Sequence, residues 1–242
     1  MASMSDAAVQ QLRLQGPPRR LQLFGPLPPN LKECRLLLPA SLSSDGQSTS
    51  VRAQIARWRE GAGEVRLSLP ERTPPGEYAA QLEMNGEAQP VALRVEPSPR
   101  LRAIPAEAVL EARPGAAAEQ TVTLSNEGNV AVRLPAASAV CLHDDNAWGD
   151  AFASTCRLES DDPQKLFNHF ILALRKGYGG MLKLRIDQAG DIPPQMERTL
   201  TIRARLSEDL LPGHSYGGEV PLGPLLYSIA VKVLEGKRGD RT

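Results

Sequence analysis

The residues best suited to chemistry gather in one run, HDDNAWGD, between His143 and Asp150. Ca²⁺ takes roughly six to eight oxygen ligands, and loops rich in Asp and Asn around a Gly can wrap it. The carboxylates of Asp144, Asp145 and Asp150 are therefore the candidate metal ligands. Their spacing departs from that of an EF-hand, and neighbouring acids also serve simply to keep a loop in water. The run is a candidate calcium site, and nothing else in the sequence predicts a cofactor.

Side chains for catalysis are scarce elsewhere. The chain has three histidines, His143, His169 and His214, and none lies in a Ser-His-Asp order or an HExxH motif. A Gly-rich phosphate loop and a CxxC pair are also missing from the sequence. We therefore expect a protein that is not an enzyme.

The three cysteines are an odd number, so they cannot all be paired within one chain. Cys141 and Cys156 could close a short loop in an exported protein and leave Cys34 free. Alternatively, all three are small buried thiols of a cytoplasmic protein. The first residues, MASMSDAAVQQLRLQG, lack the basic and apolar regions of a signal peptide. We expect a periplasmic or extracellular location with the signal absent from this chain, and the cytoplasm is the alternative.

Two groups of side chains are candidates for contact with a partner. Trp58 and Trp148 are the only tryptophans; Trp58 ends an expected strand and is predicted to be core, whereas Trp148 is the better exposed anchor. Arg185, Arg203 and Arg205 would lie on the outer faces of their strands, where they could form a basic stripe for an acidic partner. Such residues more often form the solvated face of a sheet.

Composition limits the partners. The 28 basic residues balance 28 acidic ones, which disfavours a general binder of nucleic acid or anionic membranes. No apolar run approaches the ~18 residues of a membrane span. With 21 prolines, 20 glycines and 4% aromatic residues, the chain is typical of short strands and many turns.

A β-hairpin is predicted between Pro74 and Val95. Apolar and polar residues alternate on both arms, and Asn85-Gly86 is the strongest two-residue hairpin signal because a type I′ turn needs positive φ at both positions. Tyr78 follows a Pro-Gly corner, and Tyr216 follows a second one near the end of the chain. In immunoglobulin-type sandwiches a tyrosine at this place bonds back across the corner. The simpler alternative is a core tyrosine after a turn.

The repeated closing hairpin predicts an all-β fold of two tandem immunoglobulin-like β-sandwich domains. Their expected bounds are 10–97 and 98–236, with a disordered segment 1–9 and a tail 237–242. The polar stretch 141–165 is predicted to be a long loop insertion in the second domain. The apolar run after it suits a helix started by Asp162-Pro163 or a strand from about Phe170, and we favour the strand.

The segment TVTLSNEGNVAVRL, residues 121–134, resembles the strand pair of bacterial immunoglobulin-like modules, including CARDB-like adhesion domains. It also looks like the second domain of periplasmic pilus-assembly chaperones, which are two sandwiches in tandem. The resemblance implies the fold and a non-enzymatic function, and it carries over no functional residues.

We therefore expect a protein-binding scaffold or adaptor of a bacterial surface or secreted assembly. Its partner would be another protein, bound by β-strand addition along an exposed sheet edge. One alternative is a periplasmic chaperone for pilus subunits, which would be favoured by an unpaired edge strand beside a basic cleft in the first domain. Another is a calcium- or ligand-binding accessory domain of an enzyme complex.

Overall fold

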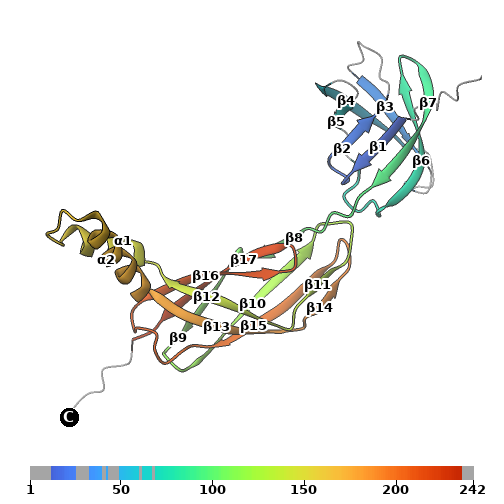
Figure 1. Cartoon of the computed structure of the whole chain (residues 1–242). Coiled ribbons are helices and arrows are strands. Elements are labelled where there is room, and N and C mark those ends of the chain that lie inside the picture. The colour runs from blue at the N-terminus through green and yellow to red at the C-terminus, as the bar shows by residue number, and fades with distance from the viewer. Residues whose placement is uncertain are drawn as a thin grey trace, which may run out of the picture. The chain divides into compact units, whose positions relative to one another are not determined.

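The computed structural model describes residues 12–25, 33–39, 42, 49–59, 62–66 and 69–235 (Figure 1). The expected disordered segment 1–9 and tail 237–242 lie outside these residues, and so does the side chain of Trp58. The chain divides into two compact units. The first comprises Met1–Pro99 and Glu127–Ala131, and the second comprises Arg100–Asn126 and Val132–Thr242.

Seven strands of the first unit form a closed ring in the order β1-β2-β5-β4-β3-β6-β7. They are β1 (Leu12–Gly16), β2 (Leu21–Phe24), β3 (Glu33–Leu38), β4 (Thr49–Arg59), β5 (Ala62–Arg66), β6 (Gly76–Met84) and β7 (Glu87–Val95). The ring closes because β1 pairs antiparallel with β2 on one side and parallel with β7 on the other. Every one of these seven strands therefore has a partner at both edges.

The hairpin of β6 and β7 has the geometry that its sequence predicts. Asn85 and Gly86 have φ values of 54° and 86°, as a type I′ turn requires, and they leave Met84 paired with Glu87. Alternate side chains of both strands face the core. The hydroxyl of Tyr78 donates a 2.9 Å hydrogen bond to the carbonyl oxygen of Pro74, across the corner that leads into β6.

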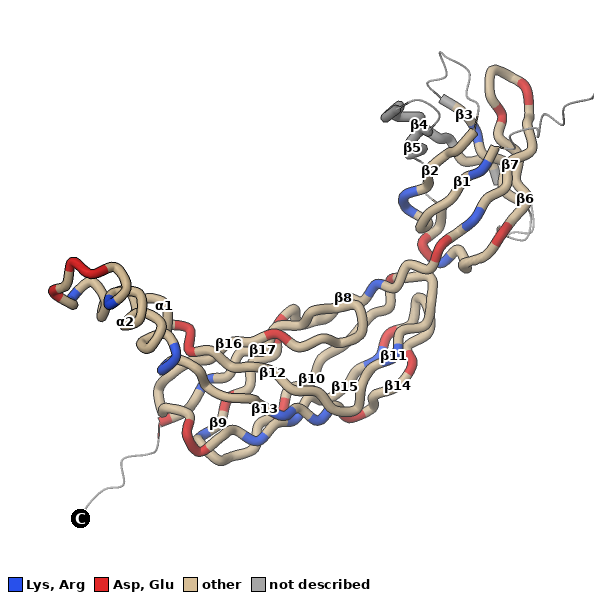
Figure 2. Tube along the Cα trace, in the orientation of Figure 1, with Lys and Arg blue, Asp and Glu red and all other residues tan. Residues whose placement is uncertain are grey.

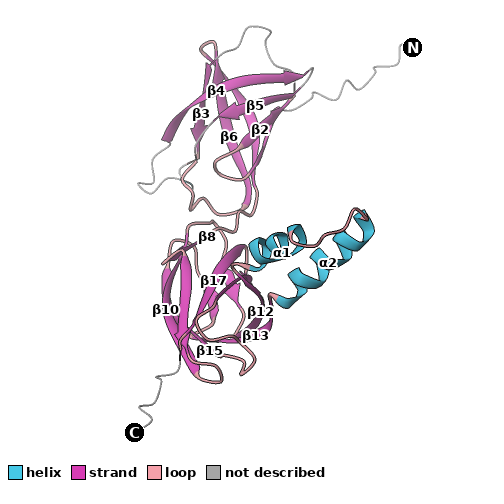
Figure 3. Cartoon of the chain, turned by 90° about the vertical axis from the view of Figure 1, so that its left-hand side faces the viewer, coloured by secondary structure: helices cyan, strands magenta, loops and turns pink. Residues whose placement is uncertain are grey.

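Ten strands and two helices make up the second unit (Figure 3). The eight strands of its main sheet follow the order β8-β10-β15-β13-β12-β16-β17-β9, and β11 pairs with β14 in a separate ribbon. The main strands are β8 (Leu101–Ile104), β9 (Glu107–Ala112), β10 (Ala117–Asn126), β12 (Ala137–Asp144), β13 (Tyr178–Asp187), β15 (Glu197–Arg205), β16 (Ser215–Leu222) and β17 (Leu225–Val233). The ribbon consists of β11 (Val132–Leu134) and β14 (Gly190–Ile192).

This strand order is that of an immunoglobulin constant-type domain. There the strands A, B, E and D form one sheet and C, F and G the other. Here β8-β10-β15-β13 corresponds to the first sheet and β12-β16-β17 to the second. The first strand is divided at the cis bond between Ile104 and Pro105, so that β8 pairs with β10 and β9 pairs parallel with β17. The first unit has the same cyclic order with an undivided first strand, so the prediction of an all-β, immunoglobulin-like fold is confirmed.

Two buried tyrosines stabilise the second unit through hydrogen bonds to the backbone. Tyr216, the second residue of β16, is 4% exposed, and its hydroxyl accepts a 3.2 Å hydrogen bond from the backbone N–H of Leu211. This contact is the tyrosine corner of immunoglobulin-like domains. Tyr227 lies in the core, and its hydroxyl donates a 3.0 Å bond to the carbonyl oxygen of Pro105. Burial raises the pKa of Tyr227 to about 12.

The prediction of a loop over 141–165 and of a strand from Phe170 is wrong. The chain instead forms two helices, α1 (Ala147–Cys156) and α2 (Pro163–Lys176), which we call the helical hairpin. Asp162 is the N-cap of α2 and accepts a 3.0 Å bond from the N–H of Gln164, while Pro163 occupies the first turn. These local start signals decided the structure of an apolar run that by itself suited either a strand or a helix.

Candidate functional site

The helical hairpin fills the connection between the neighbouring strands β12 and β13, and it extends from one end of the sheet (Figures 1 and 3). Its two ends meet at the sheet, where the N–H of Asp144 donates a 2.8 Å bond to the carbonyl oxygen of Gly177. A bulge between β12 and β13 follows directly, because Leu142 pairs with Gly180 but His143 pairs with Tyr178. We call this junction the root of the hairpin and the opposite end, residues 157–162, its tip.

The carboxylate of Asp144 organises the root. It is buried, with one oxygen 2.6 Å from Nδ1 of His214 and the other accepting a 2.9 Å bond from the N–H of Asn146. Asp145 adds a 3.0 Å bond from its N–H to the carbonyl oxygen of Ser215. Both carboxylate oxygens of Asp144 therefore take part in hydrogen bonds that fix the chain where it leaves the sheet.

The candidate calcium ligands are not brought together as a site. Asp144 is engaged at the root, Asp145 is exposed, and Asp150 lies exposed in the first turn of α1. Within the described residues, which include all three, no group of His, Cys, Asp or Glu side chains has the arrangement to hold a metal ion. The acidic run lies instead at the N-terminal end of α1.

Close packing at the root depends on Gly177, because glycine has no side chain. A Cβ atom added to Gly177 would collide with the Cβ of Ala147. Ala147 and Ala151 are the only buried residues of α1, and α2 has none. The two helices therefore touch through small residues at the root, and their larger side chains remain near the surface.

Aromatic side chains hold the hairpin together away from the root. The ring of Phe170 on α2 lies 4.9 Å from that of Phe152 and 5.7 Å from that of Trp148, measured between centroids. Trp148 and Phe152 are four residues apart on α1, and their rings are 6.4 Å apart. Such tilted aromatic pairs are favourable beyond the area they bury.

The same aromatic residues form part of an exposed apolar surface. Trp148 is 61% exposed, and Phe152 and Phe167 are 58% and 59% exposed. Ile171 is 43% exposed and lies one turn from Phe167 on α2, in the same row of side chains. We call this surface the hairpin face, and it consists of Trp148, Phe152, Phe167, Phe170 and Ile171.

This exposure is concentrated. Seven of the thirteen exposed large apolar side chains among the described residues fall between positions 148 and 181. They are four residues of the hairpin face, in which Phe170 is half-buried, together with Leu172 on α2 and Tyr178 and Met181 on β13. Single exposed apolar residues are ordinary, whereas a contiguous group of them marks an interaction surface.

Charges on the hairpin are balanced and separated along its length. From 147 to 176 there are four acidic and four basic residues. Three of the acids, Glu159, Asp161 and Asp162, lie at the tip, and two of the bases, Arg175 and Lys176, lie in the last turn of α2 at the root (Figure 2). The remaining charges are Arg157 and Lys165 near the tip and Asp150 near the root.

The expected disulfide between Cys141 and Cys156 is not formed, and both are free, exposed thiols. Helix α1 separates them: from Ala147 to Cys156 the axis rises about 14 Å, while bridged Cα atoms lie within about 7 Å. The thiol of Cys141 lies 3.6 Å from Nε2 of His143, and its hydrogen bond with Tyr178 raises the pKa of that phenol.

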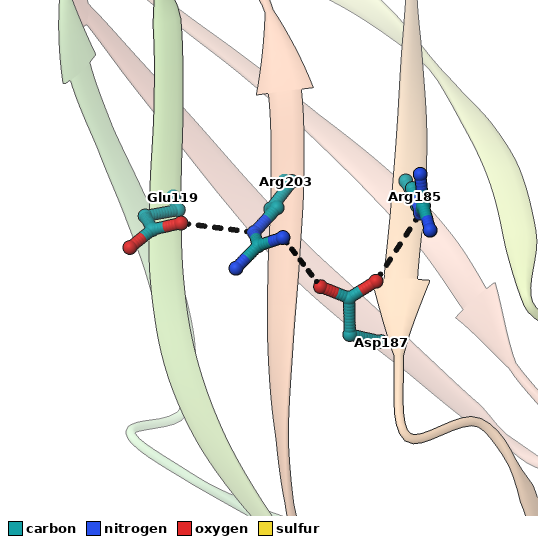
Figure 4. Close-up of polar contacts among 4 residues, drawn as sticks. All are labelled: Glu119, Arg185, Asp187 and Arg203. Atoms are coloured by element: carbon teal, nitrogen blue, oxygen red, sulfur yellow. Dashed lines mark hydrogen bonds and ion pairs between the residues drawn. The ribbon is translucent and has the colours of Figure 1, made fainter.

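The arginines of the expected basic stripe lie on the neighbouring strands β13 and β15, and acids pair with two of them, Arg185 and Arg203. Arg203 on β15 makes 2.9 Å ion pairs with Glu119 on β10 and with Asp187 on β13 (Figure 4). Arg185 lies 3.2 Å from the other oxygen of Asp187, and Arg205 donates a 2.8 Å bond to a backbone carbonyl, that of Gly115. The solvated face of the sheet therefore carries acidic and basic side chains that pair across neighbouring strands, and it is not a basic surface.

Sequence reasoning identified Trp148 as an exposed anchor but missed the rest of the hairpin face. The signal was present in the spacing, because Trp148 and Phe152, and likewise Phe167 and Ile171, are four residues apart. A spacing of four residues is typical of one face of a helix, and the prediction of a loop over this segment excluded that interpretation.

No protein-family model matches the sequence, and no curated protein matches it either. Among solved structures, the two-domain fragment DIP-gamma IG1+IG2 is 13% identical, with 93% of this chain and 96% of that one covered and a TM-score of 0.31. Titin domains I67–I69 are 12% identical, covering 94% and 65%, with a TM-score of 0.33. The PapD-like domain 7 of human CEP192 is 11% identical, covering 57% and 87%, with a TM-score of 0.29. Scores this low carry no inference about function or ancestry.

Proposed function

We propose that this protein is a non-enzymatic protein-binding scaffold or adaptor that contacts its partner through the hairpin face. The observation that carries the proposal is that the helical hairpin contributes nothing to the core. No residue between His143 and Met181 belongs to the buried apolar cluster of the second unit. An element that displays aromatic side chains without supporting the fold is best explained by what it binds.

The composition of the hairpin face suits a protein partner. Trp and other aromatic residues dominate the binding energy of protein interfaces, where they lie near the centre of the contact and a polar rim surrounds them. Here Trp148, Phe152 and Phe167 are central, and charged residues lie at both ends of the hairpin. A bound partner would bury the apolar surface of these rings, which is exposed to solvent in the free protein.

A membrane surface fits less well. Helices that lie on anionic bilayers carry Lys and Arg along the polar face, whereas this hairpin has equal numbers of acids and bases and three acids at its tip. Neither helix of the described residues combines the length and the apolar character needed to cross a bilayer.

The pilus-chaperone alternative loses its geometric basis in the first unit. It requires an unpaired edge strand to receive a subunit by β-strand addition. Each of the seven described strands there has neighbours on both sides, because β1 closes the ring. In the main sheet of the second unit, the strands with only one neighbour are the short β8 and β9.

Membership of a bacterial surface or secreted assembly and a kinship with CARDB-like modules remain part of this proposal, as does a location in the periplasm or outside the cell. The cytoplasm is the competing location. Fractionation of host cells, followed by detection of the chain in each fraction, tests this point directly.

The function is tested by capture of partners with the wild-type chain and with a Phe167→Glu/Ile171→Glu variant. We expect the variant to lose stoichiometric partners, because two carboxylates would be buried in the contact. Leu172→Glu is the matched control: Leu172 is 60% exposed on the same helix but is turned about 100° from Ile171 around the axis. Equal capture by all three proteins would contradict the proposed role of the hairpin face.

A further inference from the structure

Building on the proposed function, we propose that the partner of the hairpin face is a second copy of this chain. The two hairpins would pair across a two-fold axis, with their α2 helices antiparallel, to form a four-helix arrangement. Three features of the hairpin point to this partner: the separation of its charges, the position of its apolar row, and the area it offers.

The charges are complementary to themselves when the hairpins run in opposite directions. From Arg157 to Lys165 the formal charge is −1, from three acids and two bases, and at the root Asp150, Arg175 and Lys176 sum to +1. A parallel pair would place like charges together at both ends. An antiparallel pair places each acidic tip beside a basic root, and the two-fold axis makes this favourable contact twice.

The apolar row is placed symmetrically on α2. The helix runs from Pro163 to Lys176, and Phe167 and Ile171 lie on either side of its midpoint. A two-fold axis at the level of His169, next to that midpoint, brings Phe167 of one copy against Ile171 of the other, and the reverse. It also aligns the tip and the root, because Asp161 and Lys176 lie at similar distances from His169, about 12 Å and 11 Å along the axis.

The size of the surface is sufficient for a modest dimer. Burying four aromatic rings and one aliphatic side chain from each copy removes on the order of 1,000 Å² in total, close to the lower bound of about 1,200 Å² for stable complexes. A four-helix bundle places its core between facing helices. In this hairpin the only buried side chains of the two helices are the small ones of Ala147 and Ala151.

The test is the mass of the full chain in solution by sedimentation equilibrium, over about 1–500 µM. We expect a reversible dimer. Phe167→Glu/Ile171→Glu should weaken it at least about 100-fold, since aromatic and aliphatic residues at the centre of an interface are those that dominate it. Leu172→Glu, outside the face, should dimerise as the wild type does.

A charge exchange tests whether the charged ends of the two hairpins meet in the dimer. One variant, Glu159→Lys/Asp161→Lys, makes both ends of the hairpin basic and keeps the N-cap Asp162; the other, Arg175→Glu/Lys176→Glu, makes both ends acidic. Each alone should dimerise about tenfold more weakly than the wild type, and an equimolar mixture should recover dimers of one copy of each. Circular dichroism checks that both variants keep their helices.

Two results would overturn this inference: a wild-type chain that stays monomeric over the whole range, or a dimer that neither the face variant nor the charge variants weaken. If the monomeric chain still captured another protein and lost it with Phe167→Glu/Ile171→Glu, the hairpin face would remain a binding site for that other protein. The failure of the self-association is thereby distinguishable from the failure of the proposed function.

Discussion

At the scale of single residues, the polar side chains that suggested a metal site have a structural task. Asp144 is buried where β12 ends, and the imidazole of His214 and the N–H of Asn146 satisfy its two oxygens. A buried carboxylate is costly unless it is hydrogen-bonded. This one fixes the place where the hairpin leaves the sheet, so the acidic run helps to position the helices.

The three cysteines should differ in reactivity. Cys34 is buried in the core of the first unit, and burial raises the pKa of its thiol to about 11, so it stays protonated at neutral pH. Cys141 and Cys156 are exposed. Because the thiolate is the reactive form, we expect iodoacetamide at pH 8 to modify Cys141 and Cys156 quickly and Cys34 only after denaturation.

Peptide mass mapping of the alkylated protein measures this difference. The intact mass under non-reducing conditions should also show no loss of hydrogen from a disulfide. Rapid labelling of Cys34 in the native protein, or a bridge between Cys141 and Cys156, would be incompatible with the packing described above.

At the scale of elements, the helical hairpin depends on where its glycines lie. Gly177 faces the Cβ of Ala147 at the root, with no room for a side chain, whereas an added Cβ at Gly149 within α1 would meet nothing within 4 Å. The two positions therefore form a matched pair in which one substitution has opposite effects.

Gly177→Ala should destabilise the helical hairpin by about 1–3 kcal/mol, because the roots of the helices must move apart. Gly149→Ala should stabilise α1 by up to about 1 kcal/mol, since alanine loses less backbone entropy than glycine in a helix. Thermal unfolding followed by circular dichroism measures both effects. Effects of the same sign at the two positions would show that the root is not packed as described.

At the scale of the whole molecule, the chain uses one strand order twice and adds the helical hairpin to the second copy. The core of the second unit is built from its strands and the tyrosines that close its corners, and the hairpin is attached to it at two neighbouring strand ends. The main core and the hairpin face are therefore separate parts of the same unit.

Replacement of residues 146–176 by an Asn-Gly turn should test that separation. The turn suits two neighbouring antiparallel strands, and no core residue is removed, so we expect cooperative unfolding with a midpoint close to that of the wild type. Partner capture and dimer formation should both be lost. A shortened protein that fails to fold would mean that the hairpin supports the sheet after all.

Local sequence signals predicted most of the fold. Alternating side chains located the two arms of the hairpin between Pro74 and Val95, Asn85-Gly86 located its turn, and the two Pro-Gly corners located Tyr78 and Tyr216. These features depend on neighbours in the chain, and that is why the sequence alone contains them. The hairpin face was only partly predictable, because the run around Phe170 suits either a strand or a helix until the N-cap at Asp162 is taken into account.

The all-β class, the repeated closing hairpin and an exposed position for Trp148 could be predicted from the sequence. Long-range contacts were needed to show that β1 closes the first ring, that Asp187 and Glu119 pair with Arg185 and Arg203, and that Phe170 of α2 packs against Trp148 and Phe152 of α1. The difference lies in the range of the interactions. Alternation and turns are set by residues a few positions apart, whereas strand order, ion pairs between strands and the meeting of two helices join residues that are distant in the chain.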